Sequence, residues 1–321
     1  MTDVVVLGQA GRDLVLQVGR LPSAGGSAEV LRRIEVLGGK GANQAVALAQ
    51  MGVPVALVGV VGDDGDPLLA QARADGVDVS GVRRRPGVPS ALLVDVVGRG
   101  GARRLLEDVP DGVLLTAGDV AAAADLVAGC QALSLQMQQP GEAVRAALDL
   151  VRPDALVVAD GAPADDATRD ALLARAAVLR ADAAEAALLV GRDLDGVDDV
   201  REAALELRAA GPRLVVLSAG ADGEVVAWRA GGSRATGGAD RPADGVVRVP
   251  LSDSDPVDPT GGGDAHVAGL VAALLGGAGP AEAARTASAA ATLTVRRLGG
   301  RPDLSPAALA GQVARERVVE A

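Results

Sequence analysis

The sequence predicts an α/β fold in which helices cover a mostly parallel central sheet, with a small antiparallel sheet beside it. Along most of the chain, short runs rich in β-branched residues alternate with longer Ala-rich amphipathic stretches, a pattern typical of βα units. In two regions this alternation stops, and period-2 strands follow each other through glycine-rich connections. A length of 321 residues accommodates one such domain with a small appendage.

The central sheet and its helices are expected where the spacing of apolar residues changes. Short apolar runs predict buried strands over 4–7, 54–61, 132–135, 155–159, 178–180 and 213–217. Helical spacing predicts helices over 42–51, 67–76, 141–151, 167–177, 198–210, 264–275, 281–295 and 306–318. The apolar run 188–190 is too short to assign by periodicity, and the Gly/Arg/Asp-rich stretch 231–243 indicates a surface loop.

The strands that break the βα pattern predict the small sheet. They cover 13–18 with 28–36, and 91–97 with 102–107, and they carry polar residues at alternate positions. We therefore expect one domain over residues 1–321, with the small sheet drawn from about 13–36 and 88–107.

The composition excludes nucleic acid as an expected partner. The chain has 31 Lys and Arg against 42 Asp and Glu, a net charge of −11, and it has no Phe or Tyr and one Trp. It therefore lacks both a basic footprint and aromatic stacking platforms. The clustered cations Arg83 to Arg85, Arg103 and Arg104 are expected to form a solvated surface.

The single cysteine and the N-terminus favour a cytoplasmic protein without a membrane partner. Cys130 excludes an intramolecular disulfide and lies in an apolar stretch, so it is expected to be a buried small hydrophobe. The chain runs from Met1 directly into the first predicted strand without a basic leader, and no apolar run reaches the roughly 20 residues of a membrane span.

The segment 258–264, Asp-Pro-Thr-Gly-Gly-Gly-Asp, carries the strongest chemical signal, because a helical run follows it. Glycines at the start of a helix free the backbone to direct several N–H groups to one spot, where the helix dipole favours an anion. A carboxylate at Asp264 beside such a nest fits phosphoryl transfer: it accepts a hydroxyl proton while the nest holds the developing charge. The residues alone leave a second interpretation open, a tight loop with Asp264 as an N-cap.

A second glycine-rich segment, 38–45, also precedes a helix. It is not a P-loop, because Lys40 is followed by Gly41 instead of Ser or Thr. Lys40 and Asn43 are candidates to donate hydrogen bonds to a polyhydroxylated ligand. The alternative is a glycine-rich loop with a solvated lysine.

These two segments, together with 8–13 and 59–64, resemble the ribokinase-like (PfkB) family of carbohydrate kinases over essentially the whole chain. The resemblance implies a three-layer α/β/α fold with a mostly parallel sheet and a small antiparallel β lid over the sugar, often paired with its counterpart in a homodimer. It implies ATP-dependent phosphorylation of a sugar hydroxyl, with ribose to ribose 5-phosphate as the leading expectation. The implied cofactors are ATP, magnesium and a monovalent cation, potassium being expected.

The resemblance also implies roles for particular residues. Asp264 matches the catalytic base, and Gly261, Gly262 and Gly263 match the anion hole. Sugar-contacting positions are Asp13, Gly39, Lys40, Asn43, Gln138 and Asp264 itself. The nucleotide positions are Asp182, Ser218, Gly220, Gly223, Gly263 and Ser288. Glu185 matches a residue that holds magnesium through water, and Asp258, Thr260, Val295 and Gly300 match a monovalent-cation loop.

Four residues depart from the family pattern, and two of them, Gly11 and Gln138, lie in the sugar site. Gly11 stands in place of a sugar-binding Asn, which we interpret as leaving room for a larger substrate, and Gln138 stands in place of Glu. Asp182 replaces an Asn, and His266 replaces an aromatic residue whose packing space it is expected to fill, the other reading being a proton partner for the pocket. Another sugar or a nucleoside therefore stays an alternative substrate, and a non-catalytic ligand sensor on the same fold is a weaker alternative.

Overall fold

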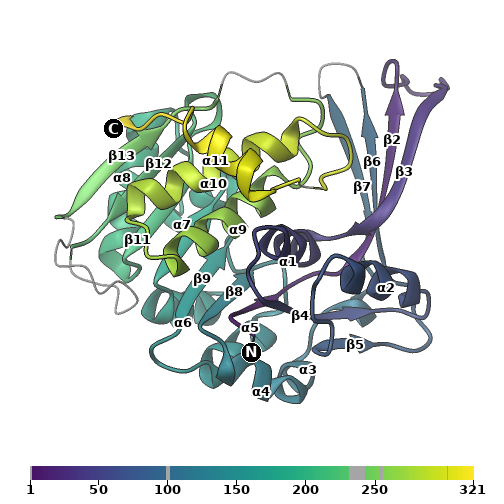
Figure 1. Ribbon diagram of the computed structural model, residues 1–321, viewed down its shortest axis with the longest axis horizontal. Helices are drawn as coiled ribbons and strands as arrows, with labels where there is room; N and C mark the ends of the chain where they lie inside the picture. Colours follow the sequence, from purple (N-terminus) through teal and green to yellow (C-terminus); the bar gives the residue numbers. More distant parts are fainter. Residues whose placement is uncertain (1, 99–101, 231–242, 253–255, 302) are drawn as a thin grey trace.

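A ten-stranded sheet forms the centre of the computed structural model, which describes the chain except for residues 1, 99–101, 231–242, 253–255 and 302 (Figure 1). Its strands run in the order β14-β13-β12-β11-β10-β9-β8-β1-β4-β5. They are β1 (Val4–Leu7), β4 (Val55–Val61), β5 (Val82–Arg84), β8 (Ala132–Gln136), β9 (Leu156–Asp160), β10 (Val178–Ala181), β11 (Leu214–Ser218), β12 (Glu224–Trp228), β13 (Gly245–Val249) and β14 (Val319–Glu320).

The predicted parallel pairing is confirmed from β11 through to β4, and β5, which was not predicted, continues it in parallel. Val4 of β1, for example, pairs in parallel with Val55 on one side and Ala132 on the other. All residues of β1 and β4 are buried, as expected for strands covered on both faces. Strands β12, β13 and β14 extend the sheet by antiparallel pairing, and the sequence analysis did not predict them.

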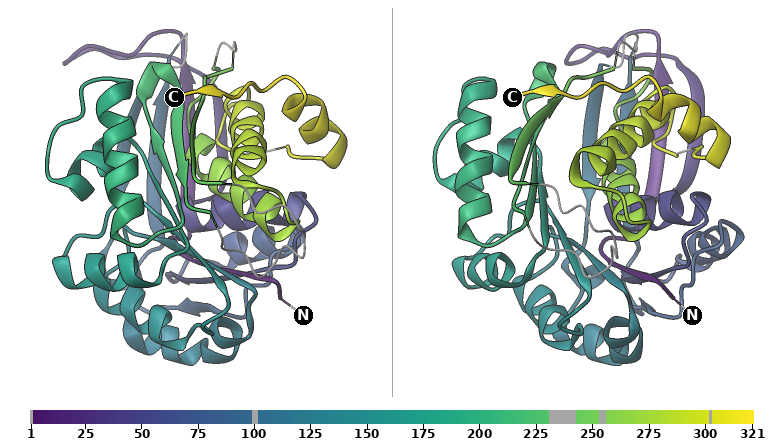
Figure 2. Two further views of the ribbon diagram at one scale, coloured as in Figure 1. Left: turned by 90° about the vertical axis from the view of Figure 1, so that its left-hand side faces the viewer. Right: turned by 60° about the vertical axis from the view of Figure 1, so that its left-hand side comes forward.

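Helices cover both faces of this sheet, and Figure 2 shows the two layers on either side of the strands. One layer contains α1 (Lys40–Gln50), α2 (Asp66–Ala74), α9 (Gly262–Leu275), α10 (Pro280–Val295) and α11 (Pro306–Val313). The other contains α3 (Ala117–Ala122), α4 (Ala124–Gly129), α5 (Gly141–Leu150), α6 (Asp166–Arg175), α7 (Ala183–Val190) and α8 (Val197–Ala210). Two short 3-10 helices, η2 (Asp111–Val113) and η3 (Gly220–Asp222), lie in loops. In the described part of the chain, no helix has the length and apolar character of a membrane span.

Each face of the sheet has its own apolar core, built mainly from Ala, Val and Leu. Cys130 is fully buried, as predicted, and its Sγ donates to the Val127 carbonyl oxygen at 3.2 Å. Helix α9 is buried around most of its circumference because it packs against both α1 and α10. This burial places the start of α9 inside the molecule.

The small sheet stands apart from the central one (Figure 1). It contains β2 (Gly11–Val18), β3 (Val30–Gly38), β6 (Ala91–Val97) and β7 (Arg103–Asp108), in the order β3-β2-β6-β7. The outer pairs are antiparallel, as predicted, whereas the central pair β2/β6 is parallel. The reason is that β2 follows β1 and β6 follows β5, so both hairpins begin in the same direction from one edge of the parallel sheet.

Three local predictions differ from the structure or gain detail from it. The helix predicted over 306–318 ends at Val313, because the segment after it leaves to form β14 against β13. The unassigned run 188–190 lies in α7. The loop predicted over 231–243 lies, except for Ala243, outside the described residues.

The clustered arginines do not share one surface. Arg84 pairs with Asp66, and Arg85 Nη2 lies 2.7 Å from Asp119 Oδ2 in α3. Arg103 is in the small sheet, where it pairs with Asp95 of the neighbouring strand. Three of the five clustered arginines are therefore in ion pairs.

Candidate active site

The carboxyl ends of the parallel strands and the starts of α1 and α9 meet at one edge of the central sheet. In open α/β sheets this edge is where ligands bind, because loops there are free of strand pairing. Gln136, Asp160, Ala181 and Ser218 are the last residues of β8, β9, β10 and β11. Most of the predicted site residues lie at this edge, and three have other positions. Asp13 belongs to the small sheet and reaches the edge from there. Gln138 is exposed beside the edge, and Ser288 lies in α10.

The glycines 261–263 form a helix start with exposed backbone donors. Gly261 is the N-cap of α9 with φ +72°, and a Cβ there would collide with the Gly300 carbonyl oxygen. Only glycine fits this position. The Gly262 N–H donates to the Pro259 carbonyl oxygen at 3.3 Å. The first-turn N–H groups of a helix have no intrahelical acceptor, so those of Gly263 and Asp264 are available to an anion.

Asp264 lies in the first turn of α9 and is buried, with 7% of its surface exposed. It makes no capping bond, so the N-cap interpretation is wrong. Its Oδ2 accepts a hydrogen bond from Asn43 Nδ2 at 3.0 Å, which joins the two glycine-rich segments. Burial raises the pKa of Asp264 to about 6, with Asp160 adding to the effect and Asn43, Lys40 and Arg180 opposing it. A carboxylate of this pKa can accept a proton near neutral pH.

Lys40 begins α1 after Gly39, whose φ is +86°. Its Nζ lies 3.5 Å from Glu185 Oε1, and one third of its side chain is exposed. Burial alone would lower the pKa of Lys40, but Asp160, Glu185 and Asp264 raise it above its ordinary value. The lysine is therefore a charged part of the site, and the solvated-loop interpretation is wrong.

The inner face of the small sheet brings two further carboxylates to the site. Asp13 is 2% exposed and Asp95 1% exposed, and each has one buried oxygen without a hydrogen-bond partner, Oδ1 of Asp13 and Oδ2 of Asp95. The Asp13 carboxylate lies against the Cα of Gly38, where any side chain would collide with it. Burial raises the pKa of Asp13 to about 7, and Asp95 and Asp264 add to this. These unpartnered acceptors suit a ligand that brings hydroxyl donors.

Asp160, Arg180 and Gln44 were not predicted as site residues. Arg180 Nη1 lies 3.0 Å from Asp160 Oδ1, and Gln44 Nε2 donates to Asp160 Oδ2 at 2.9 Å. The available signal was positional: Asp160 is a polar residue that ends a buried parallel strand, and Gln44 stands in the second glycine-rich segment.

Asp182 and Glu185 form a capping box at the start of α7. Asp182 Oδ1 accepts from the Glu185 N–H, and Glu185 Oε2 accepts from the Asp182 N–H, both at 2.9 Å. The Asp182 side chain therefore caps α7, a bond that an Asn at this position would also accept. Glu185 Oε1 stays on the side of Lys40, and a single carboxylate of this kind fits magnesium, which keeps most of its waters and binds phosphate oxygens.

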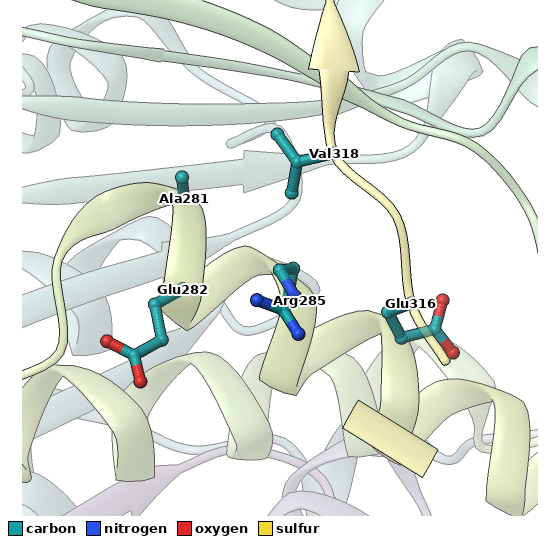
Figure 3. Close-up of a pocket in the computed structure, with 5 residues that line it drawn as sticks. All are labelled: Ala281, Glu282, Arg285, Glu316 and Val318. Carbon is teal, nitrogen blue, oxygen red and sulfur yellow. The ribbon is translucent and has the colours of Figure 1, made fainter. Parts of the chain in front are cut away.

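The predicted nucleotide-binding residues at 218–223 and at Ser288 lie on different elements, the end of β11 and α10. Ser218 ends β11, and Gly220 and Gly223 form the tight turn after it, with φ of +60° and +95°. Ser288 lies in α10, and its hydroxyl contacts Glu316 Oε2 at 3.2 Å. Glu316 also accepts from Ser252 and Gln312, so it fastens the C-terminal segment. Figure 3 shows Glu316 and Val318 on that segment across from Arg285. These residues, with Ala281 and Glu282, line a hollow of about 540 Å³, and none of the carboxyl-edge residues is among them.

The predicted cation loop is held by its own hydrogen bonds. Asp258 accepts from Thr260 N–H at 3.0 Å, from Thr260 Oγ1 at 2.6 Å and from Gly299 N–H at 2.9 Å. The Val295 carbonyl oxygen accepts from the Val257 and Asp258 N–H groups, at 2.8 and 3.1 Å. Since both lone pairs of that carbonyl oxygen are in use, the residues fit a monovalent cation only in part.

The structure shows the surroundings of three residues that depart from the family pattern, Gly11, Gln138 and His266. The interpretation that Gly11 leaves room is wrong, because a Cβ there would lie 2.7 Å from the Ala91 carbonyl oxygen in the adjacent strand. Gln138 is exposed and its Oε1 accepts from Gln136 Nε2 at 2.9 Å. His266 is buried, and its Nε2 lies 2.5 Å from Glu224 Oε2. The choice between its two readings stays a prediction.

Comparison with known proteins decides the family. The sequence pattern of the pfkB family carbohydrate kinases matches residues 1–308. The chain belongs to this family. A full-length relative of this PfkB kinase is an ATP-dependent ribose-1-phosphate kinase from Halopiger xanaduensis, 30% identical over 311 residues that make up 94% of each chain. A ribokinase from Schizosaccharomyces pombe is 33% identical over 202 residues, which are 60% of this chain and 63% of that relative.

The fold of this PfkB kinase is also that of solved ribokinases. The structure of Arabidopsis thaliana ribokinase complexed with ribose and ATP covers 98% of this chain and 99% of its own, with a TM-score of 0.72 at 23% identity. The predicted ribokinase-like α/β fold, with its small sheet beside the large one, is confirmed. As a PfkB carbohydrate kinase, the protein is a sugar kinase that transfers a phosphoryl group to an alcohol.

The raised carboxyl pKa values predict opposite pH dependences for activity and stability of this PfkB kinase. Asp264 and Asp13 bind a proton more tightly when folded (about 6 and about 7) than at the ordinary Asp value of 3.8, so folding stability falls as pH rises through this interval. Activity requires the ionised base, so kcat/KM should fall about tenfold per pH unit below pH ~6. Rate profiles and melting temperatures from pH 5 to 8 check this. A kcat/KM that stays level down to pH 5 would contradict it.

Proposed function

We propose that this kinase transfers the γ-phosphoryl group of ATP to a hydroxyl of a neutral sugar, with ribose to ribose 5-phosphate as the first candidate. The observation that carries this proposal is the pair of buried carboxylates, Asp13 and Asp95, on the inner face of the small sheet. Their unpartnered oxygens accept hydroxyl donors and disfavour a second phosphate on the substrate. Arg103, a guanidinium on this face, is already paired with Asp95.

The residues at the sheet edge account for the steps of such a transfer. Asp264 accepts the proton of the attacking hydroxyl, and Asn43 holds its carboxylate in place. The N–H groups at the start of α9 face the charge that develops on the phosphoryl group, and Lys40 adds a positive charge. Magnesium, when bound, neutralises phosphate charge, and Glu185 is the residue that would hold it through water. The turn with Ser218, Gly220 and Gly223 supports nucleotide binding at this edge.

A sugar panel tests the substrate proposal. ADP release would be followed with ribose, deoxyribose, other pentoses, hexoses, nucleosides and ribose 1-phosphate, each with and without potassium. We expect the highest kcat/KM with a neutral sugar, and a site built to bind hydroxyls to discriminate by about 10⁴ against analogues that lack them. Preference for ribose 1-phosphate would transfer the proposal to the sugar-phosphate substrate of the Halopiger relative, whereas preference for a nucleoside would support the alternative substrate. The absence of turnover with every compound would favour the ligand sensor.

The outer face of the small sheet supports a homodimer through the lid. Leu106 pairs with Val94, and Val94 with Leu14, so these apolar residues share the face opposite Asp13. Leu106 is 62% exposed. We predict that Leu106→Glu converts a dimer into monomers, because it places charge in an apolar contact. Light scattering measures the mass, and a wild-type protein that is already monomeric would contradict the proposal.

A cytoplasmic location stays a prediction.

A further inference from the structure

Arg180 lies at the carboxyl edge in β10, two residues before the capping box of α7. Its side chain is 15% exposed, and its Nη1 donates to Asp160 Oδ1 at 3.0 Å. Within the described residues this is the only hydrogen bond that the guanidinium donates. A guanidinium carries five N–H donors, so most of them are free for a ligand.

The free side of the guanidinium faces the glycine nest. A Cβ placed on Gly263 would lie 3.1 Å from Nη2 and 3.4 Å from Nη1 of Arg180. Gly263 is in the first turn of α9, next to Asp264, where the backbone donors are available. The absence of a side chain at this glycine therefore leaves the guanidinium open to whatever the nest binds.

The charges at this edge make a cation necessary for a polyanionic ligand. Carboxylates from β9, α7 and β12 surround Arg180, namely Asp160, Glu185 and Glu224. The cations that act on Asp264 are Lys40 and Arg180. A phosphoryl group that enters the nest meets several carboxylates, and these two side chains offset their repulsion.

We propose that Arg180 is a catalytic residue that binds the phosphoryl group during its transfer. The inference deepens the proposed function and rests on ATP as the donor. In the step, the sugar oxygen forms a bond to phosphorus while the bond from phosphorus to the ADP oxygen breaks, and its electron pair leaves with ADP. The hydroxyl proton goes to Asp264. Arg180 stays protonated throughout and donates to the phosphoryl oxygens, where charge accumulates.

Three variants test the role of Arg180. Arg180→Met removes the charge, Arg180→Lys keeps the charge but loses the planar fork, and the double variant Arg180→Met/Asp160→Asn avoids leaving a buried unpaired carboxylate. We expect kcat to fall about 10²–10³-fold in Arg180→Met and in the double variant, with the sugar KM within about threefold of wild type and an intermediate loss in Arg180→Lys. Affinity for ADP with aluminium fluoride, a mimic of the phosphoryl group in transfer, should fall by a similar factor.

A pH profile separates a catalytic from a structural role. The groups that face Asp264 are Asn43 and Lys40 of α1, Asp160 of β9, Arg180 of β10 and Asp13 of the small sheet. Because Arg180 favours the ionised form of Asp264, its loss should move the acid limb of kcat/KM to higher pH, whereas Arg180→Lys should restore much of this shift.

The matched control is Arg85→Met, which breaks the ion pair between an arginine and a buried carboxylate, Asp119, neither of which is among the residues assigned to the active site. It should lower the melting temperature and leave kcat unchanged. A double variant with kcat within about fivefold of wild type, together with an unmoved acid limb in Arg180→Met, would overturn the inference about Arg180 alone. A wild-type protein that releases no ADP with any sugar would instead overturn the proposed function, and this inference with it.

Discussion

Asp264→Asn should lower kcat by about 10³-fold while sugar affinity stays within about threefold of wild type, because the amide keeps the shape of the carboxylate but cannot accept the hydroxyl proton. Asn43 already donates to Oδ2 at 3.0 Å, and the oxygen of the new amide can keep that bond. The substitution also removes a buried carboxylate whose pKa burial raises to about 6, so the protein should not lose stability at neutral pH. Steady-state kinetics and calorimetric binding of the sugar measure the two effects separately.

Asp119→Asn is the control for this substitution. Asp119 is 5% exposed, forms a capping box with Thr116 and pairs with Arg85 at 2.7 Å. These partners are not among the residues assigned to the active site. The control should therefore lose stability and keep its kcat. If Asp264→Asn turned over at near the wild-type rate, the assignment of Asp264 as the base would fall.

The parts of the site that could be predicted from sequence are those that local backbone chemistry specifies. The glycines at 38–39 and 261–263 are required where they stand: Gly39 and Gly261 have positive φ, and a Cβ on Gly38 would collide with Asp13. Such requirements depend on few neighbours, so the motifs identify both helix starts before any fold is known. Lys40, Asn43 and Asp264 follow directly from them.

Arg180 and Asp160 could not be predicted in the same way. Their pairing joins β9 to β10, and their position against Gly263 depends on the packing of α9 over the sheet edge. In the sequence they are an ordinary Arg and Asp at the ends of short apolar runs. The interpretation of Gly11 was wrong for a related reason, because the space beside it is filled by Ala91 of a strand about eighty residues away.

Asp258→Ala should have the second large effect, on both stability and turnover. The carboxylate accepts bonds from the Thr260 N–H, the Thr260 hydroxyl and the Gly299 N–H, and it is 0% exposed. Its removal leaves three buried donors without a partner, so we expect the free energy of unfolding to fall by about 3 kcal/mol or more. The same bonds tie the segment before the nest to the loop 299–300, against which Gly261 lies with no room for a Cβ. Loosening that contact displaces the backbone donors, so kcat should fall by at least about tenfold in the folded protein.

Asp165→Ala is the matched control for Asp258→Ala, because both aspartates accept hydrogen bonds from a threonine N–H and its hydroxyl. Asp165 accepts from the N–H and the hydroxyl of Thr168, at 2.9 and 2.7 Å, as Asp258 does from Thr260, but it lies exposed at the start of α6. Chemical denaturation should show a smaller stability loss for Asp165→Ala, and kcat should not change. If both variants lost stability and neither lost turnover, the Asp258 bonds would support the fold alone.

Repeating the kinetics across a potassium titration tests whether Asp258 holds a cation. A cation held by Asp258 would make the wild-type rate depend on potassium and the Asp258→Ala rate independent of it, whereas a loop fastened by hydrogen bonds alone predicts no potassium dependence in either protein.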